Sequence, residues 1–493
     1  MLALAVSIDT RVFLSPRYRS LDVADPAGHG STTATVSPQG ILFHHEGVVM
    51  KRSRNSTWFG LVGLCVVVAA TAGACAAGGG SGNSGGNGGE AGSGGAGGTG
   101  GVGNNGQGGD GNILITTSNS SSGSGGAGGG VCDEGLPDAD NDGDGYTELE
   151  GDCNDCDKFV NPSAVEVIAE EDENGNLPEP ADEDCDGTID VLPPACDSGL
   201  ALASLDPVDA AKAMGVCKFL KSAKWVLSDG SPPPVDETQK ANFHLGHGIV
   251  SKLGTNNNPQ EGSSMLFLSS GKARDKGNAE ATYRTFDKGY TSNAPFGFPK
   301  PSPSCPNVIT GLPHDATGLE IEVEVPTNAL SVSFDFQFFS YEWPDFLCRE
   351  YNDFFIAYMI PFPMGQSDGN IAFDMFGAPI SVNNKFFEAC GCPGNPVGPT
   401  GECTASGFSF KCSLETKQLL GTTFEKDEAN AGWTHGSTGW LRTTTAVAPG
   451  SPIRLRLVTY DSTDGKVDSS TLIDNWRWSG KPGTTVTEVI IPK

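Results

Sequence analysis

The chain has 493 residues and a formal net charge of −29, with 60 Asp and Glu against 31 Lys and Arg. This length allows two or more domains, and the acidic balance argues against a nucleic-acid-binding protein, which needs a basic face. Most of the charge lies between Cys132 and Asp197, where Lys158 is the sole basic residue. Carboxylates at this density repel one another unless cations neutralise them, which indicates a cation-binding segment. The alternative interpretation is a solvated acidic linker.

Fourteen cysteines point to an oxidising compartment. Two of them, Cys65 and Cys75, lie in an apolar N-terminal segment, and the other twelve follow from Cys132 onward. Twelve is an even number, and their spacing does not match a four-cysteine zinc site. We therefore expect up to six disulfides in an exported protein, against the alternative of a reduced cytosolic one.

The segment 50–75 has the layout of a secretory signal. Basic residues after Met50 precede an apolar run from Trp58 to Ala74, which is short for a membrane span of about 20 residues. Its end, AGAC, resembles a bacterial lipobox, which implies lipid modification of Cys75. Cleavage with release is the alternative. Residues 1–49 have no place in such a signal, and we expect them to be a mis-called N-terminal extension.

A Gly/Ser/Asn-rich linker is predicted at 76–131. Between Gly78 and Gly130 the chain is mostly Gly, Ser, Asn and Ala, a composition that cannot form a core. A disordered tether of this length has a root-mean-square reach on the order of 40 Å. An anchor followed by such a tether would hold the rest of the chain away from a membrane.

Two Asp-x-Asp-x-Asp-Gly runs, at 140–145 and 182–187, dominate the acidic segment 132–197. Carboxylates two residues apart, followed by Gly for a tight turn, suit a hard, oxygen-seeking cation. With Asp140 at position one of a calcium loop, Gly151 stands where an EF-hand needs Glu, so this is not an EF-hand. The predicted metal ligands are Asp140, Asp142, Asp144, Tyr146 through its carbonyl, Glu148, Asp152, Asp182, Asp184, Asp186 and Asp190.

This segment most closely resembles the bacterial MopE-type metal-binding motif, and its loops also resemble those of thrombospondin type 3 repeats. The parts DADNDGDGY, GDCND, Pro162, Glu166 and EDCDGTID occur in order over about 138–190, with an insertion at 169–180. The family label includes copper binding. However, the segment 132–197 has no His, and carboxylate oxygens suit calcium better than copper. We therefore expect a structural calcium module.

The same resemblance implies a covalent link between the two acidic runs. It pairs Cys153 with Cys185, which clips the runs together. Cys132 is then a candidate partner for Cys156, which stands where the family usually has a polar residue.

From residue 198 to 493 the pattern is that of a mainly β domain. A short helix is expected first, with Asp206 as N-cap, Pro207 at its first position and Gly215 as its stop. Apolar residues then alternate with polar ones along 319–325, 332–338 and 453–457. Period-two patterning between Gly, Pro and Asn breaks predicts antiparallel strands with one buried face, hence a jelly-roll-like β-sandwich.

Several phrases of this domain resemble the bacterial choice-of-anchor L family. They are FDFQFFSYEWP from Phe334, YNDFFIA from Tyr351, GNIAF from Gly369, ISVNN from Ile380 and the Asp-rich end around LIDN. The resemblance covers about 200–480. It implies an exported bacterial protein with a surface-anchoring device, and it implies no particular reaction.

Further candidate sites fall inside this domain. A second cation site is expected at Asp461, Asp464, Asp468 and Asp474, with ordinary Asp turn chemistry as the alternative. A further polar group is expected where two aromatic-rich strands meet a loop, formed by Tyr341, Glu342, Trp343, Asn352 and Asp353. The tryptophans could stack on sugars, although core packing is the more common role. They are Trp343, Trp433, Trp440, Trp476 and Trp478.

These observations predict an exported lipoprotein of the outer membrane or cell surface, with calcium as its cofactor. Its partners would be a cell-surface polysaccharide or protein ligand for the β-sandwich and a membrane through the lipid anchor, with no nucleic acid. The chain has no HExxH or phosphate-loop motif, so we do not expect an enzyme. The alternatives are a secreted carbohydrate-active hydrolase and a surface copper-binding protein.

Overall fold

The computed structural model describes residues 19–24, 31–37, 40–44, 136–168, 177, 179–391, 402–405, 407–425 and 435–492. The predicted signal, Cys75 and the Gly-rich linker lie outside these residues. The chain divides into two compact units, Met1–Ile113 and Leu114–Lys493. None of the helices in the described part has the length and apolar character that a membrane span requires.

The first unit contains a three-stranded antiparallel sheet. Its strands follow chain order and are β1 (Arg19–Ala24), β2 (Ser31–Ser37) and β3 (Gly40–His44). It falls in the segment 1–49, which we expect from the sequence to be a mis-called N-terminal extension.

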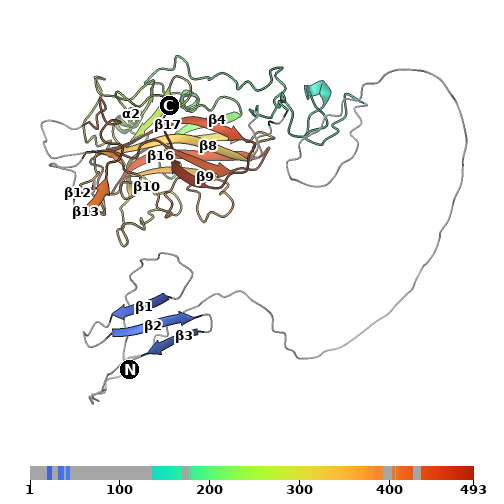
Figure 1. The fold of residues 1–493 in the computed structure, drawn as a ribbon. Helices are drawn as coiled ribbons and strands as arrows, with labels where there is room; N and C mark the ends of the chain where they lie inside the picture. Colours follow the sequence, from blue (N-terminus) through green and yellow to red (C-terminus); the bar gives the residue numbers. More distant parts are fainter. Residues whose placement is uncertain are drawn as a thin grey trace, which may run out of the picture. The chain divides into compact units, whose positions relative to one another are not determined.

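The second unit is dominated by two antiparallel sheets, as predicted (Figure 1). The five-stranded sheet has the order β10-β9-β16-β7-β4, and the larger sheet has the order β11-β14-β8-β17-β6-β5, with β15 and β18 added beside β8. The first sheet comprises β4 (Leu220–Val226), β7 (Pro313–Glu324), β9 (Phe354–Ile360), β10 (Ile380–Ser381) and β16 (Pro452–Ser462). The second comprises β5 (His247–Val250), β6 (Met265–Ser269), β8 (Ser331–Ser340), β11 (Ala389–Cys390), β14 (Gly436–Ser437), β15 (Leu441–Ala446), β17 (Ser469–Ser479) and β18 (Val486–Val489). A separate hairpin joins β12 (Glu402–Ala405) and β13 (Phe408–Lys411).

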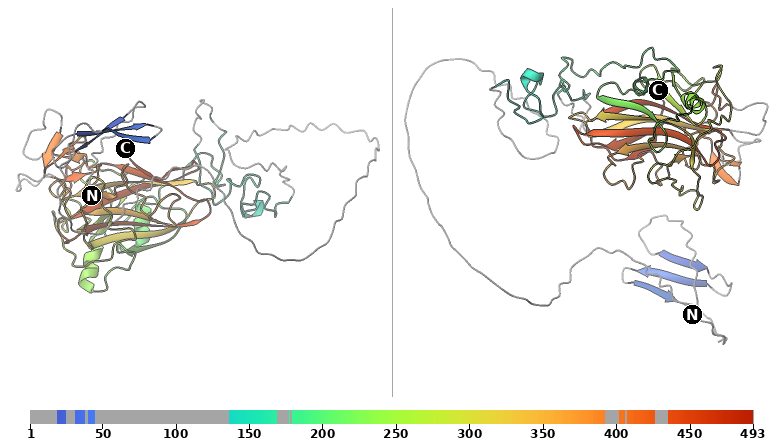
Figure 2. Two further views of the ribbon diagram at one scale, coloured as in Figure 1. Left: turned by 90° about the horizontal axis from the view of Figure 1, so that it is seen from below. Right: turned by 180° about the vertical axis from the view of Figure 1, so that it is seen from behind.

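The main core lies between the two sheets, which face each other in Figure 2. Alternate residues along parts of β7, β9 and β16 point into it from one side, and Phe334, Phe336 and Phe338 of β8 do so from the other. Because side chains alternate across a strand, this is the arrangement that the period-two pattern predicts. Its largest contributors are Phe334, Phe336, Phe338, Phe355, Leu319, Ile321, Leu455, Leu457 and Trp476.

The outer faces of both sheets are also buried in part. A second apolar cluster containing Phe339, Phe424 and Trp440 covers the eight-stranded sheet, and a third containing Phe354 and Tyr460 covers the five-stranded sheet. Long connections therefore shield parts of the outer faces from solvent.

Two helices precede and follow β4. Helix α1 (Pro207–Ala213) begins at the predicted N-cap, where Asp206 accepts a hydrogen bond from the Val208 N–H at 2.9 Å. Helix α2 (Glu237–Leu245) is not among the predicted elements, and Asp236 caps it in the same way. A 3₁₀ turn, η1 (Glu148–Glu150), lies in the acidic segment.

Disulfides staple the described chain at four points. The bonds are Cys153–Cys185, Cys196–Cys217, Cys305–Cys348 and Cys390–Cys412. Cys156 and Cys403 are disulfide-bonded as well. This cross-linking agrees with the oxidising compartment that the cysteine count predicts.

Candidate metal centre and ligand cavity

The two acidic runs fold into similar loops that their own first carboxylates hold. Asp140 accepts hydrogen bonds from the N–H groups of Gly143 and Gly145, at 2.7 and 3.1 Å. Asp182 does the same for Asp186 and Gly187, at 3.1 and 3.0 Å. The Gly that ends each run has a positive φ, 98° at Gly145 and 88° at Gly187, which explains why the motif needs Gly there.

The first loop surrounds a group of three carboxylates. Oxygens of Asp142, Asp152 and Asp155 lie within 4.8 Å of one another, and Asp152 and Asp155 are buried. One oxygen of Asp142 and one of Asp152 are buried without a hydrogen-bond partner. Buried carboxylate oxygens without donors are costly, so this donor set fits a calcium ion in its chemistry.

A second group lies in the other half of the segment. Oxygens of Glu166, Asp182 and Asp184 are within 4.8 Å of one another. Glu166 and Asp184 each keep one buried oxygen without a partner, and the other oxygen of Asp184 pairs with the Lys218 ammonium at 3.0 Å. Lys218 therefore neutralises part of the charge, while the remaining oxygens form a second donor set for a cation.

The carboxylates of the first loop repel one another when no cation neutralises them. Burial, together with the nearby charges of Asp144, Asp152 and Asp140, raises the pKa of Asp142 to about 6, although a hydrogen bond from the Asp144 N–H lowers it. Burial likewise raises the pKa values of Asp144 and Asp152. A divalent ion at this position would remove the repulsion that raises these values.

The structure sorts the predicted ligands into two sets. Besides the two groups above, Asp140, Asp142 and Asp144 form a further group in the first loop. Six predicted ligands therefore belong to groups that could hold an ion: Asp140, Asp142, Asp144, Asp152, Asp182 and Asp184. Glu148, Asp186 and Asp190 lie outside these side-chain groups. Tyr146 is predicted to bind through its backbone carbonyl, which is not a side-chain ligand, and stays a prediction. Glu148 is exposed on η1, and Asp186 instead accepts a hydrogen bond from the Thr188 N–H at 2.8 Å. Asp155 and Glu166 complete the groups and are absent from the predicted ligands, although both belong to the quoted motif.

The two halves of the module are joined covalently. The Cys153–Cys185 bond, with its Cα atoms 5.6 Å apart, links the end of the first acidic loop to the middle of the second run. Asn161 also bridges them, because its N–H donates to the Glu183 carbonyl at 2.9 Å and its amide to Asp144 at 2.7 Å. The described residues of the acidic segment thus form a single folded module, which we call the acidic module (residues 136–168, 177 and 179–190).

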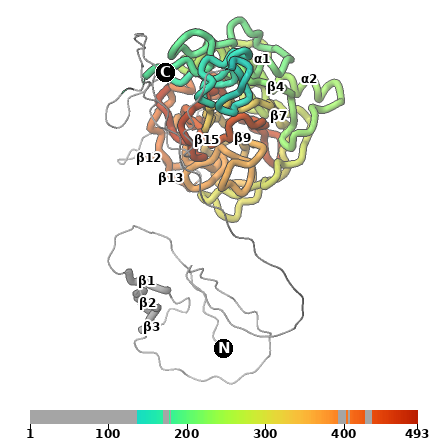
Figure 3. The backbone as a smooth tube through the Cα atoms, turned by 90° about the vertical axis from the view of Figure 1, so that its right-hand side faces the viewer, coloured from blue at the N-terminus to red at the C-terminus, as the bar shows by residue number. Residues whose placement is uncertain are grey.

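The acidic module is docked on the sandwich by a short set of hydrogen bonds. Asn328, in the turn between β7 and β8, accepts from the Val165 N–H at 3.0 Å and donates to the Val165 carbonyl at 2.7 Å. Thr327 donates its hydroxyl to Asn161 at 2.8 Å, and Lys218 completes the contact through Asp184. Figure 3 shows the module in teal beside the sandwich. The residues that make these contacts flank the candidate metal ligands.

The four Asp residues predicted as a second cation site are not all brought together. Asp461, Asp464 and Asp468 act on one another electrostatically near the β16–β17 turn. Asp474 lies further along β17, where its carboxylate accepts from the N–H groups of Gln260 and Glu261 at 2.6 and 3.2 Å. Asp461 is instead beside Asp353 and Glu342.

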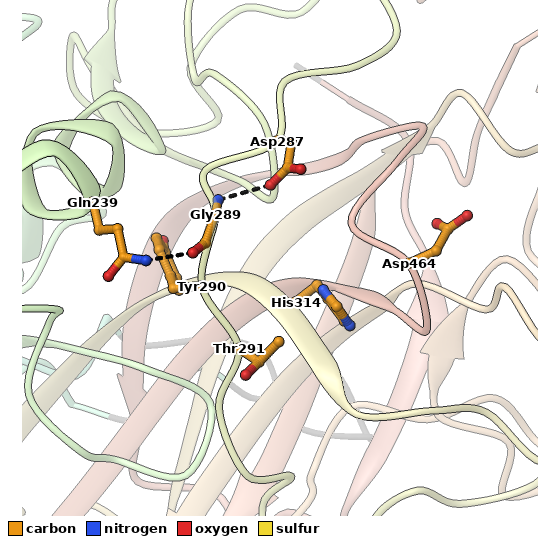
Figure 4. A pocket seen from close by; sticks show the side chains of 7 residues that line it. All are labelled: Gln239, Asp287, Gly289, Tyr290, Thr291, His314 and Asp464. Carbon is orange, nitrogen blue, oxygen red and sulfur yellow. Dashed lines mark hydrogen bonds between the residues drawn. The ribbon is translucent and has the colours of Figure 1, made fainter.

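A cavity of about 530 Å³ opens beside the β16–β17 turn. Figure 4 shows its lining, which comes from α2, the segment before β7, the start of β7 and the turn itself. The lining residues are Gln239, Asp287, Gly289, Tyr290, Thr291, His314 and Asp464. Gln239 donates to the Gly289 carbonyl, and Tyr290 is mostly buried. The cavity is thus a polar hollow with two carboxylates, within the size range of small-molecule sites.

The tryptophans do not form a sugar-stacking platform in the described residues. Trp343, Trp440 and Trp476 are buried, and Trp478 packs against the main core. Trp433 lies outside the described residues. Core packing is therefore the role of those that are described.

Comparison with known proteins places the sandwich in a family. Residues 237–476 match the family model of the Choice-of-anchor L domain. No curated protein and no solved structure matches the chain. The match covers every strand from β5 to β16 and most of β17. The chain therefore contains a Choice-of-anchor L domain, and this domain together with its β-rich fold indicates an exported cell-surface protein.

Proposed function

We propose that this protein is a surface lipoprotein whose β-sandwich binds an extracellular polysaccharide, with the acidic module as a calcium-stiffened joint before it. The observation that carries the joint is the pair of carboxylate groups with buried, unpartnered oxygens at Asp142, Asp152, Glu166 and Asp184. Calcium would satisfy these oxygens and thereby hold the residues that contact Asn328 and Lys218 in place.

The cavity beside the β16–β17 turn supports the choice of ligand. Carboxylates, a hydroxyl and an imidazole suit the hydroxyl groups of a sugar, which both donate and accept hydrogen bonds. Asp287, Thr291 and His314 supply these groups around one hollow. We therefore place the polysaccharide in this cavity.

Binding to a panel of bacterial polysaccharides tests the ligand, using the full chain in calcium and again in EDTA. We expect at least one polysaccharide to bind, and Asp287→Asn to weaken that binding at least tenfold. Glu237→Gln is the matched control, because it removes an equal charge from the exposed start of α2, outside the cavity lining. A chain that binds nothing in the panel, or an Asp287→Asn variant that binds as well as the parent, would contradict the proposal.

Limited proteolysis tests the joint. Calcium should protect the acidic module from cleavage, and Asp142→Asn should abolish that protection. Glu150→Gln should keep it, since Glu150 is exposed and belongs to neither carboxylate group. Protease resistance that is the same in calcium and in EDTA would refute the calcium joint.

A further inference from the structure

Three acidic side chains meet inside the sandwich, far along the chain from the acidic module. Glu342 follows β8, Asp353 precedes β9, and Asp461 lies near the end of β16. They are exposed by only 1 %, 0 % and 1 %, respectively. We call them the interior acids.

Backbone pairing explains why these three segments converge. The residue after Asp353 pairs with the residue before Asp461, across β9 and β16. Asp353 also accepts from the Ser462 N–H at 3.2 Å and from the Ser469 hydroxyl at 2.6 Å. It thereby links the five-stranded sheet to the eight-stranded sheet.

The interior acids repel one another. Asp353 and Glu342 both act electrostatically on Asp461, and so do the nearby Asp468 and Asp464. Asp353 lies within hydrogen-bond reach of Asp461. The principal charges at this point are therefore all negative, and no ion pair in the described part of the chain involves an interior acid.

Three carboxylate oxygens of the set have no hydrogen-bond donor. One oxygen of Glu342 and both oxygens of Asp461 are buried and accept no hydrogen bond from an N–H or hydroxyl group. A buried charge normally persists only when it is paired or coordinates a metal. The three oxygens without a donor are therefore available to coordinate a cation.

We infer that Glu342, Asp353 and Asp461 form a second, interior binding site for a divalent cation of the calcium class. Carboxylate oxygens from three segments, with no sulfur or imidazole among them, match the preference of calcium over softer metals. The site would tie the segment after β8 to the edges of β9 and β16. It goes beyond the proposed function, since it lies in the sandwich and not in the acidic module.

The carboxylate oxygens of the interior acids are spaced more widely than those of the groups in the acidic module, which lie within 4.8 Å of one another. Ligands on opposite sides of a calcium ion stand about 5 Å apart. Cation binding at this site would therefore require the three carboxylates to move closer together.

The test is the calcium content of the full chain, measured by elemental analysis after refolding in calcium and dialysis. Asp461→Asn and Glu342→Gln should each lose about one calcium ion per chain relative to the parent. Asp474→Asn, a buried acid on β17 whose oxygens accept backbone hydrogen bonds, should keep the parent content. Because Asn and Gln keep the shape of the acid and remove a buried charge, both interior variants should fold. If one of the two variants fails to fold, the calcium content of the other variant is the test of the site.

Thermal unfolding, followed by the fluorescence of the buried tryptophans, supplies a second readout. Calcium should raise the midpoint of the parent sandwich, because a ligand that binds only the folded state stabilises it. That rise should vanish in Asp461→Asn. An unchanged calcium content in both interior variants, with higher stability than the parent in EDTA, would overturn the inference and show that the acids share protons instead. Loss of calcium in Asp142→Asn concerns the acidic module alone, so the two proposals can fail separately.

Discussion

Replacing Asn328 by Ala should release the acidic module from the sandwich without unfolding either. The Asn328 side chain is 6 % exposed and makes two hydrogen bonds to one residue, at 3.0 Å to the Val165 N–H and at 2.7 Å to its carbonyl. Each such bond contributes about 0.5–1.5 kcal/mol net, so the pair stabilises docking by about 1–3 kcal/mol. The equilibrium between docked and released module should therefore shift by about 5- to 150-fold.

Hydrogen exchange at the Val165 amide measures this shift directly. That amide donates to Asn328, so its exchange rate should rise by the same factor when release limits exchange. Asn256→Ala is the control, because Asn256 is exposed and bonds the Lys417 carbonyl at 2.6 Å, in a different part of the sandwich. A Val165 amide that exchanges equally fast in the parent and in Asn328→Ala, or a control with the same acceleration, would refute this account of docking.

Three further predictions concern stability. Arg442→Met should lower the free energy of unfolding by about 3 kcal/mol in denaturant titration. It removes the two bonds from Arg442 to the buried Asp335, at 2.7 and 2.9 Å, and leaves that carboxylate with the Asn475 amide but no counter-charge. Lys417→Met, at an exposed ion pair, should cost less than about 1 kcal/mol, and equal losses in the two variants would count against this explanation. Burial raises the pKa of Asp474 from 3.8 to about 7 in the folded chain. Between these two pH values the folded state therefore binds more protons than the unfolded state. The free energy of unfolding should fall as pH rises from about 4 to 7, by up to about 1.4 kcal/mol per pH unit. Asp474→Asn should flatten this slope, and an unchanged slope would show that Asp474 is not its source. Cys153→Ser opens a loop of sequence separation 32 and should cost the acidic module about 3–4 kcal/mol, seen as proteolysis in calcium that the parent resists.

Strand positions could be predicted from the sequence because burial on one face imposes a period of two. The alternating segments at 319–325, 332–338 and 453–457 lie within β7, β8 and β16. The alternation did not reveal that Glu320 is buried, at 3 % exposure, where Arg456 and Lys224 bond its carboxylate. That partnership depends on neighbouring strands and cannot be read from one strand alone.

The metal ligands were predictable where the ligand set is local. The Asp-x-Asp-x-Asp-Gly runs place their carboxylates within a few residues, so spacing alone identifies them. Asp155 and Glu166 join these groups only because the chain folds back, and spacing does not record that. The interior acids come from three segments more than a hundred residues apart at the extremes, Glu342 to Asp461, and only strand pairing brings them together.

The Cys196–Cys217 bond has a mechanical consequence for a protein held at its N-terminal side. Tension applied before Cys196 crosses the sulfur bridge to Cys217 and reaches β4 three residues later, at Leu220. Helix α1 lies inside the bridged loop and therefore carries none of the pull. Once the contacts of the acidic module have yielded, the first non-covalent element of the sandwich to resist is the pairing of β4 with β7 at the edge of the five-stranded sheet. We therefore expect this ladder to set the force at which the sandwich begins to unfold.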